Sequence, residues 1–288
     1  MDETLHSYAS FPKIWVMDFD GTLKPLENPV SGEDKRALQI LGDRGLTRVI
    51  ATGRTIKTFM KDWEPAIAID YLISSTGLGI SKFNLDGPAE LLVSRSFDPE
   101  TAAAAIDLAK EVNLGFFLSF PPPETHVFYY SRPEKDEPSC FTVRLTQYEM
   151  YGSPYRGERD FPLAQVLIMG TPQTIAKLRS RFDALVPPVS TVISTSPYGD
   201  GAHWLEIYPP QVSKGHAAAK LASLLGLDNT QAVALGNDFN DRELLDWAGI
   251  SYISSQAPLE LKSLYRPMPP AGKGPLAFVL DQLEKKWQ

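Results

Sequence analysis

Two carboxylates stand two residues apart at the end of a short apolar run, in the segment Asp18-Phe19-Asp20-Gly21-Thr22. Side chains at positions i and i+2 of an extended segment point to the same side, so Asp18 and Asp20 can face one pocket. Two such charges are costly together unless a cation or a shared proton offsets them. A hard divalent cation such as Mg²⁺ would do so, although Asp-Gly is also a common turn dipeptide and this segment alone leaves both explanations open.

Groups that suit an anionic ligand occur at two further places. Thr52 ends a second apolar run and precedes Gly53 and Arg54, which together offer a hydroxyl and backbone amides to a phosphate oxygen. Lys214 stands at the start of a predicted helix, where the helix dipole disfavours a cation unless an anion is bound there. Each residue also has an ordinary explanation, because Thr52 suits a helix N-cap and most lysines are solvated on the surface.

A run of polar residues, Gly236-Asn237-Asp238-Phe239-Asn240-Asp241, follows a later apolar segment. Its oxygen-bearing side chains could complete a metal site and hold a phosphate. The alternative is a helix cap rich in Asn and Asp. Four groups of this kind in order, each at an expected strand or helix end, would be a rare coincidence.

Alternating strands and helices are expected to position these groups. Ser31 and Gly45, for example, suit the beginning and the end of a helix. The alternation predicts an α/β fold with a doubly wound parallel sheet, in which ligands bind at the carboxyl ends of the strands. We therefore expect the polar segments to meet there and to bind one metal ion and one phosphoryl group. The strands are expected over residues 14–17, 47–52, 71–74, 232–235 and 250–253, and the helices over 32–44, 55–63, 213–225 and 242–247.

The regular alternation of strands and helices is interrupted between residues 82 and 208, where short strand-like runs surround two predicted helices. Thr171, followed by proline at the first helical position, is a strong start signal for the second of them. This pattern predicts an α+β domain over residues 82–208, inserted into a core formed by residues 1–81 and 209–288. The helices are expected over 99–112 and 171–185, and the strands over 90–94, 116–120, 126–130, 164–169 and 189–195.

Composition narrows the class of protein. The chain is 43% hydrophobic and 22% charged, which is ordinary for a globular protein, and its apolar runs are too short to span a bilayer. A net charge of −7 without a block of Lys and Arg argues against a nucleic-acid partner. A single cysteine, Cys140, and an N-terminal segment without a signal pattern predict a cytoplasmic protein.

Taken together, the motifs resemble the haloacid dehalogenase superfamily, in its Cof-like branch with a large α/β cap inserted after the third strand. The resemblance implies a Rossmann-like core and a cap that selects the substrate, and it spans nearly the whole chain. It runs through Asp18-Phe19-Asp20-Gly21-Thr22-Leu23, Ala51-Thr52-Gly53-Arg54, Ser75-Thr76-Gly77, Val212-Ser213-Lys214-Gly215 and Gly236 to Asp241.

The resemblance also implies a role for each matching residue. Asp18 would attack phosphorus to form an aspartyl-phosphate, and Asp20 would protonate the leaving oxygen and then activate the hydrolytic water. Positive charge near the phosphoryl oxygens would stabilise the transition state. The residues implied to bind the phosphoryl group are Thr52, Gly53, Lys214 and Asn240.

A Mg²⁺ ion is implied as the cofactor. Its ligands would be the Asp18 carboxylate, the main-chain oxygen of Asp20, and the last motif through Asn237 or Asp241. The family more often has Asp where this chain has Asn237, but an amide oxygen can still ligate Mg²⁺. Whether Asn237 or Asp241 makes the direct contact is left open.

The expected function is hydrolysis of small phosphorylated metabolites, with sugar phosphates as the first candidate substrates. One alternative is a specialised phosphoglycolate or mannosyl-phosphoglycerate phosphatase. Another is a weakly catalytic regulatory module that binds phosphometabolites, which Asn237 suggests and the presence of both Asp18 and Asp20 disfavours. No nucleic-acid or membrane partner is expected, and the oligomeric state is open, with a monomer plausible.

Overall fold

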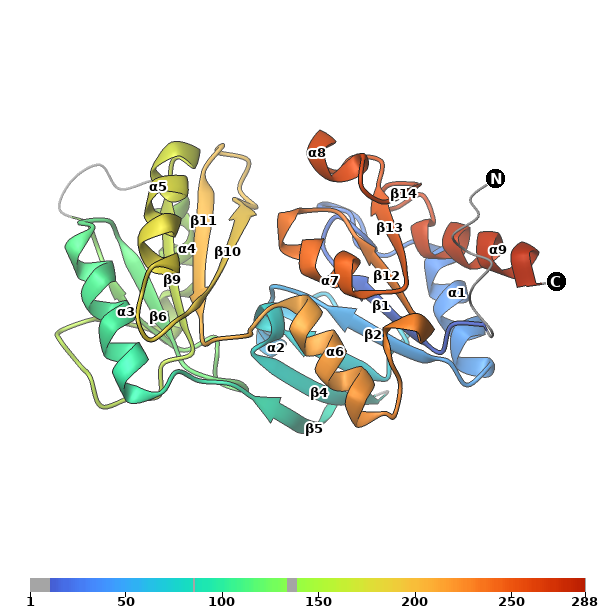
Figure 1. Ribbon diagram of the computed structural model, residues 1–288, viewed down its shortest axis with the longest axis horizontal. Helices are drawn as coiled ribbons and strands as arrows, with labels where there is room; N and C mark the ends of the chain where they lie inside the picture. The colour runs from blue at the N-terminus through green and yellow to red at the C-terminus, as the bar shows by residue number, and fades with distance from the viewer. Residues whose placement is uncertain (1–10, 85, 134–138, 288) are drawn as a thin grey trace. The chain divides into compact units, whose positions relative to one another are not determined.

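The computed structural model describes residues 11–84, 86–133 and 139–287, which form two compact units (Figure 1). The core unit takes in the described residues of Met1–Arg54, Thr58–Leu92 and Lys214–Gln288. The inserted unit takes in those of Thr55–Lys57 and Val93–Ser213.

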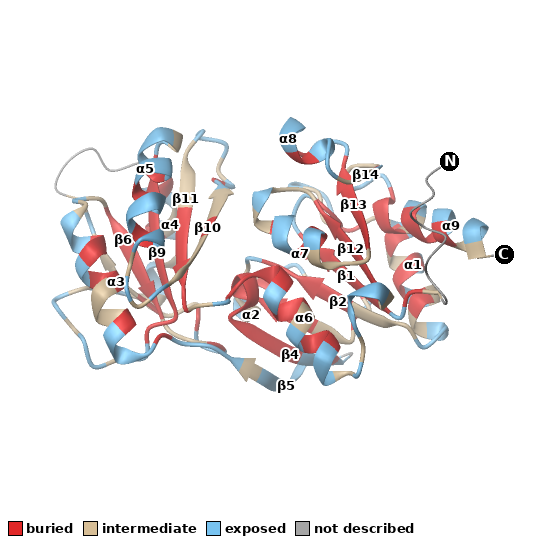
Figure 2. Ribbon diagram, in the orientation of Figure 1, coloured by how far each residue is buried: buried red, intermediate tan, exposed pale blue. Residues whose placement is uncertain are grey.

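A sheet of eight described strands forms the centre of the core unit, in the order β14-β13-β12-β1-β2-β3-β4-β5. The strands from β14 to β3 run parallel, which confirms the expected α/β fold with a doubly wound sheet, and β4 runs antiparallel to β3. Figure 2 shows the central strands as buried, as parallel sheets covered on both faces require. The bounds are β1 (Ile14–Asp18), β2 (Thr47–Ala51), β3 (Tyr71–Ser74), β4 (Gly79–Asn84), β5 (Gly87–Ser94), β12 (Ala232–Gly236), β13 (Ile250–Ser254) and β14 (Arg266–Met268).

The strand order places β1 between β2, which follows it in sequence, and β12, which comes after the inserted unit. The chain therefore winds away from β1 in both directions, and the loops after β1, β2 and β12 leave the same edge of the sheet. In sheets of this type a crevice forms at such a reversal of winding, outside the carboxyl ends of the strands. Ligand-binding residues are expected there.

Helices cover the core sheet, and one buried carboxylate joins two of them. The Ser31 hydroxyl caps α1 by accepting a hydrogen bond from Asp34 N at 3.1 Å, as the sequence suggested. Asp34 Oδ1 in turn accepts a hydrogen bond from Leu276 N at 2.9 Å, which ties the first turn of α9 to α1. The described helices outside residues 93–213 are α1 (Gly32–Asp43), α2 (Ile56–Phe59), α6 (Lys214–Leu224), α7 (Arg242–Trp247), α8 (Leu259–Lys262) and α9 (Pro275–Trp287).

Several features of the core unit differ from the sequence expectation, which contained none of β4, β14, α8 and α9. The helix expected over residues 55–63 is wrong beyond Phe59, because the chain turns there and both Asp62 N and Trp63 N donate to Phe59 O at 3.1 Å. Pro65 then disfavours helical backbone at the residue before it. The core sheet also continues past residue 81 through β4 and β5, so the run at 90–94 pairs in the core sheet, and the division between the two units falls within β5, after Leu92.

The inserted unit is an α+β structure around a sheet of six described strands, in the order β10-β11-β9-β6-β7-β8. Alternate residues of the strands contribute to two apolar clusters, one on each face: Phe116 and Leu118 belong to one, and Phe117 to the other. Among the described residues, no helix has the length and apolar character needed to cross a membrane. The bounds are α3 (Pro99–Glu111), β6 (Phe116–Ser119), β7 (Phe128–Ser131), α4 (Ser139–Tyr148), β8 (Gly152–Pro154), β9 (Gln165–Gly170), α5 (Pro172–Asp183), β10 (Ser190–Thr195) and β11 (His203–Tyr208).

Candidate active site

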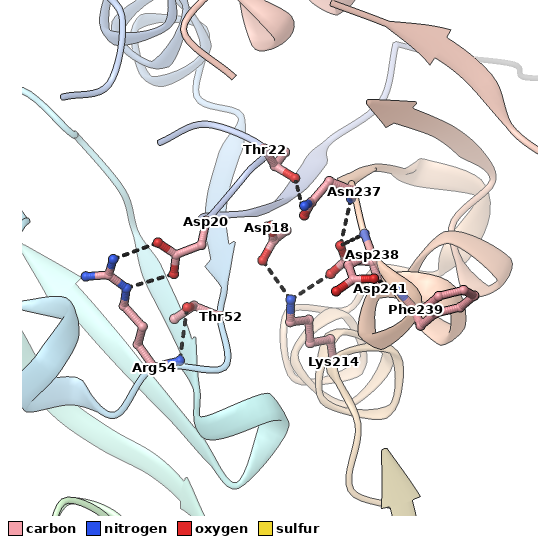
Figure 3. Close-up of polar contacts among 10 residues, drawn as sticks. All are labelled: Asp18, Asp20, Thr22, Thr52, Arg54, Lys214, Asn237, Asp238, Phe239 and Asp241. Atoms are coloured by element: carbon pink, nitrogen blue, oxygen red, sulfur yellow. Dashed lines mark hydrogen bonds and ion pairs between the residues drawn. The ribbon is translucent and has the colours of Figure 1, made fainter. Parts of the chain in front are cut away.

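The polar segments singled out in the sequence lie together at the carboxyl ends of β1, β2 and β12 (Figure 3). Asp18 is the last residue of β1, and Thr52 follows the last residue of β2. Lys214 is the first residue of α6, and the segment from Asn237 to Asp241 follows β12. The structure thus brings together segments that lie up to about two hundred residues apart in sequence, as expected for a binding crevice of this fold.

A buried ion-pair cluster forms the centre of the site. Lys214 Nζ donates to Asp18 Oδ1 at 2.7 Å and to Asp241 Oδ1 at 2.6 Å, and all three side chains are buried. Burial alone would lower the pKa of the Lys214 ammonium, but the two carboxylates raise it above its ordinary value. Lys214 is therefore charged, and its place at a helix start is explained by two anionic partners.

The same cluster leaves Asp18 in an unfavourable environment for a carboxylate. Burial, followed by the negative charge of Asp241, raises the pKa of Asp18 to about 7, while the Lys214 ammonium opposes this shift. One buried cation faces two buried carboxylates, so the fully ionised cluster carries one net negative charge. An additional cation would stabilise it.

Asp241 shapes the loop after β12. Its Oδ2 atom accepts hydrogen bonds from the backbone N–H groups of Asn237 at 2.8 Å and Asp238 at 3.1 Å, while Oδ1 accepts from Lys214. The carboxylate therefore uses three of its roughly four acceptor positions within the protein. This arrangement favours Asn237 over Asp241 as the residue that reaches an external ligand.

The side-chain amide of Asn237 lies among three oxygens. We assign its Nδ2 toward them, because in that orientation it donates to Thr22 Oγ1 at 3.1 Å, Asp18 Oδ2 at 2.9 Å and the main-chain oxygen of Asp20 at 3.1 Å. A carboxylate oxygen and a main-chain oxygen thus converge on one point, where the amide hydrogens now supply positive charge. Rotation of the amide by half a turn would place its Oδ1 beside these two oxygens in place of Nδ2.

These oxygens suit a hard cation such as Mg²⁺. Within residues 11–84, 86–133 and 139–287, no group of three or more His, Cys, Asp or Glu side chains is arranged to hold a metal ion. A metal site here would instead combine the Asp18 carboxylate, the Asp20 main-chain oxygen and the Asn237 amide oxygen. Mixed oxygen sets of this kind are common for Mg²⁺, so the residues present fit the ion.

Asp20 faces a different partner from Asp18. In Figure 3 the Asp18 carboxylate points toward Lys214, whereas the Asp20 carboxylate points toward Arg54. Arg54 Nε and Nη2 donate to its two oxygens at 2.7 and 2.6 Å. The Asp20 side chain is 49% exposed, so it remains accessible to a ligand or to water.

The loop after β2 presents the remaining groups expected to bind phosphate. Thr52 is buried, and its hydroxyl accepts a hydrogen bond from Arg54 N at 3.1 Å, while Gly53 is exposed. Asn240 lies half-buried on the one-turn helix η5 (Phe239–Asp241), and its side chain makes no hydrogen bond within the part of the chain that the structure describes. Phosphate binding by Thr52, Gly53 and Asn240 stays a prediction.

Sequence reasoning missed two residues of this region. Arg54 stood in a recognised motif, but only its backbone was given a role and its side chain none, and Asp62, which forms an ion pair with Arg54, was not considered. The place of Arg54 directly after Thr52 and Gly53 was a signal for the first. No local pattern marks Asp62, because the turn that follows α2 brings it to Arg54.

Comparisons with known proteins identify the family to which these features belong. A model of haloacid dehalogenase-like hydrolases matches residues 15–266. Putative phosphatase YxeH of Bacillus subtilis (strain 168) is 22% identical over 249 residues, which cover 85% of this chain and 88% of that protein. HMP-PP phosphatase of Yersinia pseudotuberculosis serotype O:1b (strain IP 31758) is 24% identical over 256 residues, which cover 87% of this chain and 86% of the other.

A solved structure gives the same result for the fold. The structure described as the HAD subclass IIB sugar phosphatase BT4131 superposes with a TM-score of 0.72 at 15% sequence identity. The match covers 95% of this chain and 99% of that one. The likeness therefore extends over both the core unit and the inserted unit, each with its own fold.

Proposed function

The chain belongs to the haloacid dehalogenase-like hydrolases and is a phosphatase of their Cof-like branch, and from this premise we propose that it hydrolyses sugar phosphates or similar small phosphomonoesters. We further propose that Asp18 is the nucleophile and that Mg²⁺ is the cofactor. The observation that carries this proposal is the buried Asp18 carboxylate at the carboxyl end of β1, with Lys214 Nζ at 2.7 Å.

In the proposed reaction, an oxygen of Asp18 attacks the phosphorus atom and the bond from phosphorus to the leaving oxygen breaks. Asp20 enters this step protonated and donates its proton to that oxygen, so the product leaves as an alcohol and Asp20 becomes a carboxylate. The Asp20 carboxylate then takes a proton from a water molecule, whose oxygen attacks the phosphorus of the aspartyl-phosphate. This step releases inorganic phosphate and restores the Asp18 carboxylate.

Charge stabilisation accounts for the other residues of the site. The Lys214 ammonium offsets negative charge on the phosphoryl oxygens as the nucleophile approaches. The Thr52 hydroxyl and the Gly53 backbone N–H donate hydrogen bonds to these oxygens. Asp241 holds Lys214 and the loop amides in place, so its role is to position the cation rather than to contact the substrate.

Asp18, the main-chain oxygen of Asp20 and Asn237 would hold the Mg²⁺ ion. When bound, Mg²⁺ neutralises charge on the phosphoryl group and on the Asp18 carboxylate. The convergence of Asp18 Oδ2 and Asp20 O on the Asn237 amide supports this assignment.

Sugar phosphates are the first substrate class to test, since one matched structure is named a sugar phosphatase. HMP-PP is the second candidate, supported by relatives named HMP-PP phosphatases at 24% identity. Selection among these compounds by the inserted region, which the sequence placed at residues 82–208, remains a prediction.

Release of inorganic phosphate from a panel of phosphorylated metabolites tests the proposal. We expect turnover with Mg²⁺, loss of turnover in EDTA and recovery when Mg²⁺ is restored. Asp18→Asn should reduce turnover to background, whereas the control Asp34→Asn removes another buried carboxyl of the core unit and should retain it. Undiminished turnover by Asp18→Asn would refute the nucleophile assignment.

A further inference from the structure

The Arg54 side chain makes several contacts that phosphate binding by the loop after β2 does not require. It follows Thr52 and Gly53 after β2, and its Nε and Nη2 donate to Asp20 Oδ2 at 2.7 Å and Oδ1 at 2.6 Å. Two parallel hydrogen bonds from a planar guanidinium fix both the position and the orientation of a carboxylate. A lysine in this position would fix only a distance.

A second carboxylate holds the guanidinium from the other side. Arg54 Nη1 donates to Asp62 Oδ2 and, at 3.4 Å, to the main-chain oxygen of Thr58. The guanidinium also lies 5.3 Å from the centre of the Phe19 ring, which limits its movement out of plane. Arg54 is thus restrained by groups that do not depend on Asp20.

The series of ion pairs that begins at Asp20 ends at Lys24, in the same turn after β1. Lys24 Nζ lies 4.0 Å from Asp62 Oδ2, and the main-chain oxygen of Lys24 accepts a hydrogen bond from Gly21 N at 2.9 Å. Asp20, Arg54, Asp62 and Lys24 therefore alternate in sign, and the first and last belong to one turn after β1. This closed arrangement couples the direction of the Asp20 side chain to Asp62.

Stability alone does not account for the network. The Arg54 side chain is 24% exposed and that of Asp20 is 49% exposed, and ion pairs so open to water contribute little to folding. Although burial alone would lower the pKa of Arg54, the hydrogen bonds and charges of Asp20 and Asp62 raise it above its ordinary value. The Arg54 guanidinium therefore stays charged, and its hydrogen bonds can hold the Asp20 carboxyl group in one orientation.

We propose that Arg54, held in turn by Asp62, is the positioning residue for Asp20: in the acid step one Asp20 oxygen keeps its hydrogen bond from the guanidinium, while the other carries the proton for the leaving oxygen. The inference rests on the proposed function, in which Asp20 is the acid and then the base. Arg54 and Asp62 act through Asp20. Their removal should therefore impair the reaction of substrates that need a proton on the leaving oxygen more than that of substrates that do not.

The experiment compares two leaving groups. Glucose 6-phosphate releases an alkoxide that must be protonated, whereas p-nitrophenyl phosphate releases a stable phenolate. The measured quantity is the ratio of kcat/KM for these substrates, because kcat/KM reports the first chemical step and not the later hydrolysis of the aspartyl-phosphate. Where glucose 6-phosphate is a poor substrate, the best alkyl phosphate of the panel takes its place.

Arg54→Gln should lower this ratio by roughly 100-fold, the range in which general acid catalysis acts, and Arg54→Lys by less. Asp62→Asn should lower it by about 5-fold, since the guanidinium would keep its contact with Asp20 but lose its own support. The graded series and circular dichroism spectra separate positioning from misfolding.

Arg48 provides the matched control. It lies in β2, the strand that precedes Arg54, and its Nε and Nη2 contact the carboxylate of Asp70 at 3.0 and 2.7 Å, in the same bidentate manner. Arg48→Gln removes an equivalent ion pair and should leave the ratio unchanged. An equal loss of kcat/KM for both substrates in Arg54→Gln, or no loss, would overturn the inference while the proposed function stands. A parent chain that hydrolyses no compound of the panel would overturn the proposed function first.

Discussion

Binding of Mg²⁺ should release a proton from Asp18, and the affinity should therefore depend on pH. Burial, followed by the negative charge of Asp241, raises the pKa of Asp18 to about 7, against the influence of Lys214. Since the value is raised, the metal-free fold holds Asp18 protonated below this pH and ionised above it. A divalent cation binds the carboxylate, so the proton must leave when the cation arrives.

The size of the effect follows from the pKa. At pH 6 only about one molecule in ten carries an ionised Asp18, so the apparent affinity for Mg²⁺ should be roughly tenfold weaker than at pH 8. About 0.9 protons should be released per Mg²⁺ bound at pH 6, and about 0.1 at pH 8. Isothermal titration calorimetry in two buffers that differ in ionisation enthalpy measures both the affinity and the number of protons.

Asp34 offers a control for the source of the proton. Burial raises the pKa of this carboxyl group also, but Asp34 binds the backbone of α9 and lies outside the site. Asp34→Asn should therefore leave the number of released protons unchanged. Equal affinities at pH 6 and pH 8, with no proton released at pH 6, would refute the reasoning that Asp18 is a ligand that is protonated in the metal-free protein.

Three further predictions concern the neighbours of Asp18. Lys214→Met should lower the free energy of unfolding, measured in urea, by about 3–5 kcal/mol, because it leaves two buried carboxylates without their cation. Adding Asp241→Asn should recover part of this loss. Unchanged stability of Lys214→Met would contradict the importance of the buried cluster. Gly215→Ala should lower the midpoint of thermal unfolding, with a loss of about 1–3 kcal/mol in the free energy of unfolding. The added Cβ would clash with the main-chain oxygen of Glu243 and force α6 away from α7. An unshifted midpoint would show that the two helices can separate freely. Asn237→Asp should increase the affinity for Mg²⁺ roughly tenfold at pH 8, measured by calorimetry, because a second carboxylate would face the cation. An unchanged affinity would count against direct ligation by residue 237.

The sequence predicted the parallel core strands β1, β2, β3, β12 and β13 but not the short edge strand β14, and burial explains the difference. Only one of the three residues of β14 is buried in the structure, whereas every residue of β1, β12 and β13 is. In such strands burial and strand propensity favour the same conformation, and polar residues directly after them mark the carboxyl ends. The meeting of Asp18, Lys214 and Asp241 could be predicted for the same reason.

Segments with mixed exposure were predicted less well. β5 is mostly exposed, so its residues carry no apolar signal that assigns it to the core sheet rather than to the insertion. The strand β11 and the helix α4 were both absent from the expectation, since short segments in an α+β unit depend on tertiary packing more than on periodicity. The ion pair between Arg54 and Asp62 was also missed, because it depends on a turn at Phe59 where the sequence predicted a continuous helix.

Asn237 links the charge of the site to its readiness for a metal ion. With Lys214 between two carboxylates, the cluster is neutral while Asp18 is protonated and carries one negative charge when it is ionised. The Asn237 amide adds no charge, yet it donates to Asp18 Oδ2 and to the main-chain oxygen of Asp20, and so holds both oxygens together without a cation. An aspartate at 237 would instead repel Asp18 until a cation bound. If Mg²⁺ binds here as proposed, the amide should therefore favour an ordered metal-free site at the expense of metal affinity, because it replaces a charged ligand with a neutral hydrogen-bond donor.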